Sequence, residues 1–438
     1  MTQSQLFIDK QRKLIAGDGH LLSKQASQFS SGVWPGYYSK AKGADVWDLD
    51  GHKYCDMSIG GIGATIHGYA DEEVDDAVKK AISNGVSSSL LPEEEIQLAE
   101  LLIELNPWAK KVRFARTGGE AMSIAVRLAR ASTGADKILF CGYHGWHDWY
   151  LSANHNGNDS LEGHLLPGLS ARGVPKGLRS SAIPFPYGDL DRLESLLKDN
   201  YGEVAAVVME PIRNIYPDPT YLNDVKKLVE KYNTFLIFDE ISSAFRMNSG
   251  PAYSLFDVEP HMAVFSKALG NGYAISALVG TDEVMEAANI SFISSTCWTE
   301  RVGPAAAIAT ITKHRRENTG QHLMSIGEKV QSGWKSIAQK HNLDIDIGGI
   351  PPLSHFSFRS DENMSIIKAY YVQEMLKRGF LASNIFYSMG AHSENNVREY
   401  LTATDEVWGN MKKHLESPGE LRNKLDGEPS HMGFKRMT

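Results

Sequence analysis

Short apolar runs alternate with amphipathic helical stretches through the middle of the chain. The runs are rich in aliphatic and aromatic side chains, and they lie at residues 112–116, 137–141, 204–209, 235–238, 262–265 and 277–280. Strands with this pattern are typical of a parallel sheet that is covered on both faces. Their alternation with helices predicts an α/β fold with a mainly parallel sheet and right-handed crossovers.

Both ends of the chain have a different pattern. An amphipathic helix and a polar loop are expected within residues 1–40, and the alternation over residues 44–56 around an Asp-Gly turn predicts a β-hairpin. From about residue 330 onward, helix signals alternate with short strand signals, and the tail from Ser417 is polar. We therefore expect a second, smaller lobe.

Two segments without a clear helix or strand pattern are expected near a ligand or at the surface. Residues 58–68 are dense in glycine but lack the third glycine of a dinucleotide fingerprint, so we interpret them as a loop near a ligand or a partner subunit. Residues 151–188 are rich in Asn, Gly, Pro and Ser. They are predicted to form a long surface excursion that shapes substrate access.

Composition narrows the class of protein. The chain has 438 residues, a length that exceeds one compact domain. Hydrophobic residues make up 42% of it, a fraction that indicates a globular enzyme. Its formal net charge of −8 argues against a nucleic-acid surface. The N-terminus lacks the apolar core of a signal peptide, and no run of about 18 apolar residues is present, so we expect a cytoplasmic protein without a membrane partner. Three cysteines without CxxC spacing fit a reducing compartment.

One acid and one lysine stand where apolar strands end. Asp239 follows the run 235–238, and Lys267 follows the run 262–265 just before a Gly-Asn-Gly turn. A desolvated lysine is a nucleophile toward carbonyls, and a buried acid at a strand end calls for a cationic partner. A lysine that forms an imine and an acid that holds a pyridinium nitrogen indicate pyridoxal 5'-phosphate. The alternative is a helix cap or loop anchor beside a solvated lysine.

Two further turns carry candidate chemistry. Thr117, Gly118 and Gly119 open a helix directly after a strand, and backbone N–H groups at that position suit a phosphate. A simple strand-to-helix connection is the alternative. Tyr143 follows the strand 137–141 and is placed to stack on a planar ring. His144, His147 and Asp148 resemble metal ligands, but no further His or Cys has a supporting spacing, so stacking is favoured and no metal is expected.

Six motifs, taken together and in this order, resemble the class III (subgroup II) pyridoxal-phosphate aminotransferases, and in particular the branch similar to glutamate-1-semialdehyde 2,1-aminomutase. They are VWDLDGHKYCDM, VRFARTGGEAMSIAVRLARA, YHGWHD, MEPI, FDEISSAFR and FSKALGNG, and the resemblance extends from about residue 44 to 412. It implies a type I fold, with a seven-stranded sheet in the large domain and a small α+β domain built from both termini. We place the domains at residues 1–69, 70–325 and 326–438.

The resemblance also implies roles for individual residues. Lys267 would form the Schiff base with the cofactor, and Asp239 would pair with the pyridine nitrogen. Cofactor contacts are further implied for Thr117, Gly118, Gly119, Tyr143, His144 and Ile241, and from the neighbouring subunit of a homodimer for Thr299, with Thr296 as the alternative. Glu210 would lie near the cofactor and the substrate. Arg213 departs from the family pattern and is interpreted either as a substrate-binding residue or as a structural ion pair.

The implied reaction is amino-group transfer. An amino donor displaces Lys267 from the aldimine, the freed amine removes the donor α-proton, and a pyridoxamine phosphate form passes the amino group to a carbonyl acceptor. We favour an aminotransferase for a carbohydrate-derived or other biosynthetic ketone. An aminomutase that moves the amino group within one molecule is the alternative, and a non-catalytic dimeric scaffold is a remote one.

Overall fold

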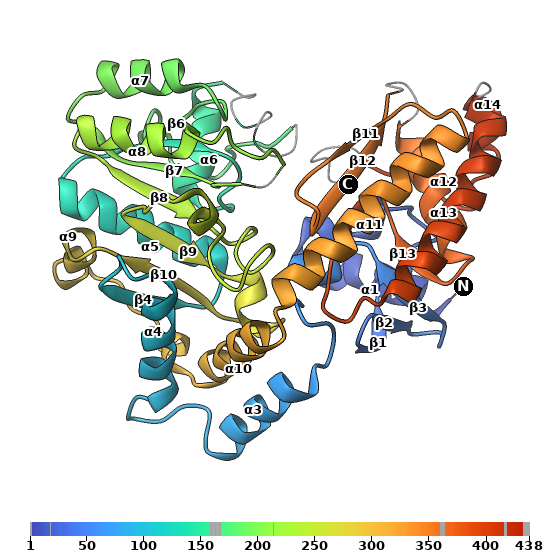
Figure 1. Ribbon diagram of the computed structural model, residues 1–438, viewed down its shortest axis with the longest axis horizontal. Helices are drawn as coiled ribbons and strands as arrows, with labels where there is room; N and C mark the ends of the chain where they lie inside the picture. The colour runs from blue at the N-terminus through green and yellow to red at the C-terminus, as the bar shows by residue number, and fades with distance from the viewer. Residues whose placement is uncertain are drawn as a thin grey trace. The chain divides into compact units, whose positions relative to one another are not determined.

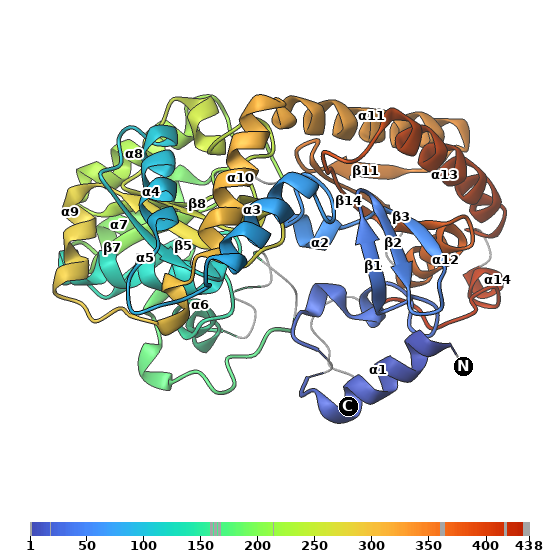
Figure 2. The ribbon, with the colours of Figure 1, turned by 90° about the horizontal axis from the view of Figure 1, so that it is seen from below.

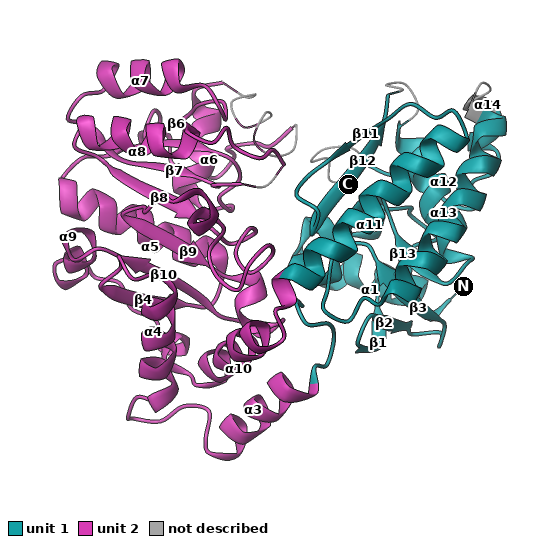
Figure 3. Cartoon of the chain, in the orientation of Figure 1, with its two compact units in different colours: residues 1–71, 321–438 teal, residues 72–320 magenta. Residues whose placement is uncertain are grey.

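The computed structural model describes residues 2–17, 19–157, 161, 164, 168–212, 214–359, 364–415 and 418–431. The chain divides into two compact units, residues 72–320 and residues 1–71 with 321–438 (Figure 3). Within the described residues, no helix combines the length and the apolar character needed to cross a membrane.

The unit of residues 72–320 is built around a seven-stranded sheet in the order β4-β10-β9-β8-β7-β5-β6 (Figure 1). Its strands are β4 (Lys111–Ala115), β5 (Lys137–Cys141), β6 (Ala182–Pro184), β7 (Val204–Met209), β8 (Phe235–Asp239), β9 (Met262–Phe265) and β10 (Ser276–Gly280). β10 runs antiparallel to both of its neighbours, β4 and β9, and all the other pairs of neighbouring strands in this sheet are parallel. The predicted mainly parallel α/β sheet is therefore confirmed.

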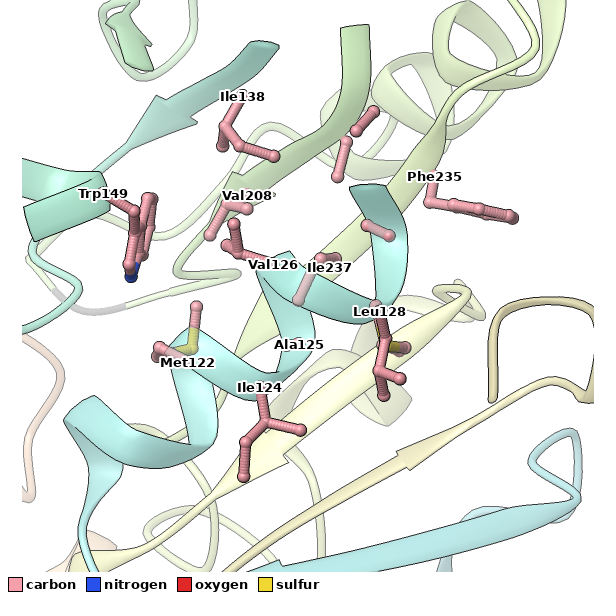
Figure 4. Close-up of a cluster of buried hydrophobic side chains, with 14 of the residues drawn as sticks. Met122, Ile124, Ala125, Val126, Leu128, Ile138, Trp149, Val208, Phe235 and Ile237 are labelled. Atoms are coloured by element: carbon pink, nitrogen blue, oxygen red, sulfur yellow. The ribbon is translucent and has the colours of Figure 1, made fainter. Parts of the chain in front are cut away.

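Helices of this unit pack on the sheet or on one another through their apolar faces. They are α3 (Glu72–Ser83), α4 (Glu93–Leu105), α5 (Gly118–Thr133), α6 (Asp148–Leu151), α7 (Leu190–Asp199), α8 (Tyr221–Lys231), α9 (Asp282–Met285) and α10 (Val302–Arg316). Met122 and Val126 of α5 pack with Ile138, Val208 and Ile237 of three strands (Figure 4). This packing fixes α5, and with it the glycine turn at its start. Helices α3 and α10 lie side by side (Figure 2).

The surface excursion predicted for residues 151–188 contains the short strand β6, which pairs with β5. Sequence patterns miss β6 because it spans three residues and ends in Pro184, a residue that sheets tolerate only at an edge. The last of the helix signals expected after residue 330 corresponds to α13 (Glu394–Leu415).

The unit formed by both chain ends has two small sheets. β1 (Tyr38–Lys42), β2 (Asp45–Asp48), β3 (Lys53–Met57) and β13 (Phe380–Ala382) form one, and β11 (Ile345–Gly348), β12 (Leu353–Phe358) and β14 (Ile385–Tyr387) form the other. The β2–β3 pair confirms the predicted hairpin. Its helices are α1 (Gln3–Leu14), α2 (Gly60–Gly63), α11 (Thr319–Lys340), α12 (Met364–Leu376), α13 and α14 (Pro418–Arg422).

Candidate active site

The acid and the lysine predicted from the sequence lie on the same edge of the sheet. β8 and β9 are parallel neighbours, and Asp239 at the end of β8 is in register with Val264 of β9. Lys267 follows the end of β9 and opens a 3₁₀ turn, Lys267–Gly270. Ligands of parallel sheets bind at this carboxyl edge. The topology therefore brings together the two groups that the sequence singles out.

The backbone of Lys267 is held in the left-handed region, with φ at +46°. This conformation costs a residue with a side chain on the order of 1 kcal/mol and persists where the surrounding structure enforces it. The side chain is half-buried, and its Nζ donates a hydrogen bond of 2.7 Å to Oγ of Ser242. Ser242 has no distinguishing signal in the sequence, because a serine in a turn fits many patterns.

Asp239 is paired with a histidine. Its Oδ2 lies 2.8 Å from Nδ1 of His144, and both side chains are buried, with the residues 2% and 1% exposed. Nε2 of His144 lies 3.0 Å from the carbonyl oxygen of Cys141, which can only accept, so Nε2 carries a hydrogen. The other carboxylate oxygen, Oδ1, accepts from the backbone N–H of Ile241 at 3.0 Å. Asp239 is thus held at both oxygens in one orientation.

The glycine turn begins α5 in the way predicted, with an additional capping arrangement. Oγ1 of Thr117 accepts from the N–H of Glu120 at 3.4 Å, and Oε2 of Glu120 accepts from the N–H of Thr117 at 2.9 Å. This capping box occupies two of the end groups of the helix. The Thr117 hydroxyl serves as the helix cap here, and the N–H groups of Gly118 and Gly119 are at the N-terminal end of the helix dipole.

The two glycines are required by close neighbours. A Cβ at Gly118 would lie 2.8 Å from Cδ1 of Ile241, and a Cβ at Gly119 would lie 3.1 Å from Nε2 of His147. The turn after β4, the segment after β5 and the turn after β8 therefore meet at one place. A planar ring that lies against Ile241 would have its substituents within reach of the N–H groups of this glycine turn.

Two other predicted residues follow β5 and β7. The N–H of Tyr143 donates to Oε2 of Glu210 at 3.4 Å, and Glu210 is buried. The ring of Tyr143 makes an edge contact with Tyr150. Arg213, predicted as a substrate or ion-pair residue, lies outside the described residues.

Thr296 and Thr299 bound a short 3₁₀ helix, and both are exposed. The hydroxyl of Thr299 donates to the carbonyl of Thr296 at 3.1 Å. Arg116, the residue before the glycine turn, donates from Nη2 to the carbonyls of Trp298 and Glu300, each at 2.9 Å. The segment that carries Thr299 is thereby attached to the start of the glycine turn.

The three residues weighed as metal ligands do not converge. His144 bonds Asp239, whereas Nδ1 of His147 lies 2.7 Å from Oγ of Ser123, and burial lowers the pKa of His147. Asp148 opens α6. In the part of the chain that the structure describes, no group of three or more His, Cys, Asp or Glu side chains is arranged to hold a metal ion.

Glu240 is a second buried acid, directly after Asp239. Oε2 accepts from the hydroxyl of Ser243 at 2.6 Å and Oε1 accepts from the N–H of Tyr253 at 2.8 Å, so Glu240 fastens the connection between β8 and β9. Burial raises the pKa of Glu240 to about 7, from an ordinary value of 4.5. Since the folded chain holds this proton more tightly, its contribution to stability is complete below pH 4.5 and is lost as the pH rises through about 7.

We expect Glu240→Gln to remove this pH dependence. Glutamine imitates the protonated acid, because its carbonyl accepts from Tyr253 and its amide donates to the Ser243 hydroxyl. At pH 8 the free energy of unfolding of the variant should exceed that of the unmodified chain by about 1–3 kcal/mol, and near pH 4.5 the difference should vanish. Urea denaturation across this pH range measures it, with Glu230→Gln on the surface of α8 as the control. Parallel pH profiles for the variant and the unmodified chain would contradict the expectation.

The family model Aminotransferase class-III matches residues 28–405. The chain belongs to the class III aminotransferase family. It is 32% identical over 427 residues to the 3-aminobutyryl-CoA aminotransferase of Cloacimonas acidaminovorans (strain Evry), a match that covers 95% of this chain and 99% of that relative. It is 30% identical to the 2'-deamino-2'-hydroxyneamine transaminase of Streptomyces kanamyceticus, covering 87% and 92% of the two chains.

The fold of this class III aminotransferase is shared with solved structures. The FumI protein of Sphingopyxis sp. MTA144, in its PLP internal aldimine form, superposes with a TM-score of 0.86 at 24% identity, covering 98% of this chain and 99% of that one. The aminotransferase is a pyridoxal-phosphate-dependent enzyme of fold type I. The expected fold, cofactor and amino-transfer activity are thus confirmed, whereas the two relatives reported above are aminotransferases and do not confirm the aminomutase-like branch.

The residues at the sheet edge fit this cofactor. A buried acid suits the ring nitrogen, an apolar side chain and an aromatic one suit the two ring faces, and a helix N-terminus with two glycines suits the phosphate. A Cβ on Gly118 would lie too close to Ile241, the side chain that would face the ring, so glycine is needed at this position.

Proposed function

We propose that Lys267 and Asp239 form the reacting centre of this aminotransferase, which moves an amino group from a small-molecule amine to a small-molecule ketone or aldehyde. The observation that carries the proposal is the placement of a strained, half-buried lysine and a buried, doubly anchored acid at the carboxyl ends of neighbouring parallel strands. Strained backbone and buried acids are concentrated at functional sites.

Each residue has a distinct task in this proposal. Pyridoxal 5'-phosphate supplies a ring that takes up the electron pair left when a bond breaks at the donor's amino-bearing carbon. Asp239, kept in orientation by His144 and Ile241, holds the proton of the ring nitrogen. The Nζ of Lys267 binds the cofactor covalently and, when free, takes the proton from the donor carbon.

Other residues orient the reactants. The N–H groups of Gly118 and Gly119 would bind the phosphate, and Ile241 and Tyr143 would contact the two faces of the ring. Glu210, which accepts from the N–H of Tyr143, would contact the substrate side of the ring. We retain Arg213 as a candidate contact for a substrate anion.

The acceptor is proposed to be a biosynthetic ketone. One relative is named for an amine on the third carbon of an acyl-CoA, and the other for position 2' of neamine. Neither name describes the amino group of a common α-amino acid. These names support a carbohydrate-derived ketone or a 3-oxoacyl compound as the acceptor, with an α-amino acid as the donor.

Half-reactions test the proposed function and separate it from the aminomutase alternative. The purified holoenzyme is mixed with glutamate or alanine alone, and the keto acid released per active site is measured together with the change in the cofactor's absorbance. An aminotransferase releases about one keto acid per cofactor, whereas a mutase does not release it stoichiometrically. Candidate ketones are then added to the aminated enzyme. No release with any donor would overturn the proposal.

We also propose a homodimer with its active sites at the interface. Several large apolar side chains are exposed in the unit of residues 72–320, among them Leu90, Leu91, Ile96, Ile290 and Phe292, the last at 87%. Exposed apolar surface of this kind marks interaction sites. A cavity of about 330 Å³ lined by Leu90, Leu91, Thr299 and Arg301 places the exposed threonine beside these side chains. In such a dimer we propose that Thr299 reaches the cofactor phosphate bound by the partner subunit. Light scattering measures the mass of the assembly, and the mass of a single chain would overturn the proposed dimer.

We also propose domain boundaries and a cellular location for this enzyme. The domain boundaries at 69/70 and 325/326 are retained as a proposal, with the large domain binding the cofactor. We propose a cytoplasmic location, without nucleic-acid or membrane partners, on the basis of composition and charge.

A further inference from the structure

Ser242 is a polar residue of the site to which no role has been assigned. It lies in the turn after β8, three positions beyond Asp239, and is 9% exposed. Its Oγ accepts a hydrogen bond of 2.7 Å from Nζ of Lys267. A hydrogen bond between a flexible lysine and a serine matters only if both partners are held in place.

The turn that carries Ser242 is fixed through its backbone. The N–H of Glu240 donates to the carbonyl of Val264 in β9 at 2.9 Å, and the N–H of Ala244 donates to the carbonyl of Glu240 at 3.0 Å. The carbonyl of Ser242 itself accepts from Nε of Arg246 at 3.0 Å, and Arg246 is buried. The serine oxygen therefore has little freedom beyond rotation about one side-chain bond.

The lysine is fixed from the other side. Ser266 precedes it with extended backbone, and the N–H of Leu269 donates to the carbonyl of Ser266 at 3.0 Å. The hydroxyl of Ser266 donates to the carbonyl of Ile275 at 3.2 Å. Together with the left-handed conformation of Lys267, these bonds fix the direction in which the lysine side chain leaves the backbone.

We propose that Ser242 is a positioning residue for the amine of Lys267. Once one N–H of Lys267 is donated to Ser242, rotation about the Cε–Nζ bond is fixed, and the lone pair of the neutral amine is restricted to one of two remaining tetrahedral directions. A base whose lone pair is already oriented loses less freedom when it takes a proton. The inference rests on the proposed role of Lys267 as that base.

The hydrogen bond has a second, measurable consequence. An acceptor stabilises the ammonium form of lysine more than the neutral amine, because the charged N–H group makes the stronger hydrogen bond. Without the Ser242 hydroxyl, Lys267 should lose its proton at lower pH. A serine that only fills space would have no such effect.

Competitive labelling of the cofactor-free protein tests this without depending on enzyme activity. Acetic anhydride reacts with the neutral amine, and mass spectrometry of the peptide that contains Lys267 gives the labelled fraction against pH. We expect Ser242→Ala to move the midpoint of this curve down by about 0.5–1 pH unit. Ser242→Thr keeps the hydroxyl and should restore the midpoint. Ser254→Ala removes a hydroxyl that donates to the Pro251 carbonyl in the same connection, and serves as the matched control.

The loaded enzyme provides the second measurement. In the half-reaction with a donor that the unmodified enzyme accepts, Ser242→Ala should lower kcat about three- to tenfold with little change in KM, and Ser242→Thr should recover most of the loss. An unchanged midpoint and an unchanged kcat in Ser242→Ala would overturn the positioning role of Ser242 and would leave the proposed function of the enzyme standing. Loss of the half-reaction in the unmodified enzyme would instead overturn the proposed function. Equal effects in Ser242→Ala and Ser254→Ala would show a general disturbance of the turn and would also overturn the inference.

Discussion

Replacing Lys267 with alanine is expected to abolish covalent cofactor binding and to lower the rate of amino transfer by about 10⁴-fold. The substitution removes both the nitrogen proposed to bind the cofactor covalently and the base proposed to take the donor proton. Alanine and lysine both carry a Cβ and therefore have a similar cost in the left-handed backbone conformation. The substitution should leave the turn at the end of β9 in place. The visible absorbance of the purified protein and its half-reaction rate measure the two effects.

Lys226→Ala is a suitable control for this experiment. Lys226 lies on α8 and pairs with Glu230, away from the sheet edge, and its side chain is largely buried, as that of an active-site lysine would be. We expect the control to retain the absorbance and the rate. A Lys267→Ala protein that keeps its visible band after removal of free cofactor would refute the assignment of Lys267.

The second large effect is expected for Asp239→Asn, which should reduce the rate about 10²- to 10³-fold while the cofactor remains covalently bound. Asparagine preserves the geometry of the site. Its oxygen can accept from the N–H of Ile241, and its amide can donate to Nδ1 of His144, which then serves as an acceptor with Nε2 still bonded to the Cys141 carbonyl. What the variant loses is the negative charge that we propose keeps a proton on the ring nitrogen.

The measurement for Asp239→Asn is the single-turnover rate with a saturating donor, compared with the absorbance of the bound cofactor. Asp257→Asn, in a turn of the same connection and exposed, is the matched control and should behave as the unmodified enzyme. A normal rate in Asp239→Asn would show that the charge has no part in the reaction.

The sequence predicts the central sheet well because buried parallel strands have a strong, local signature. The runs that become β7 and β8 are apolar throughout, and each is entirely buried in the structure. The turn of Gly118 and Gly119 is equally local, since the glycines directly precede a helical pattern. The antiparallel direction of β10 has no such signature, because pairing direction is a property of two strands and of the connection between them.

Contacts between distant segments are the part that sequence patterns do not give. His144 follows β5 and Asp239 ends β8, and β7 lies between these strands in the sheet. Their hydrogen bond depends on strand order and on side-chain direction, neither of which periodicity reports. The contact between Ser242 and Lys267 is of the same kind, so the sequence pattern indicates the lysine but not the serine.

The left-handed backbone at Lys267 also has a consequence for which residue would be most stable at this position. Asn271, four positions later, has the same φ of +46°, and asparagine is one of the few residues that adopts this conformation readily. At position 267 a glycine would make the turn easier to fold, by about 1 kcal/mol, and would remove the amine that we propose as the reacting group. Folding stability and the proposed chemistry therefore favour different residues at position 267. A screen of variants for thermal stability alone would enrich proteins that lack this lysine.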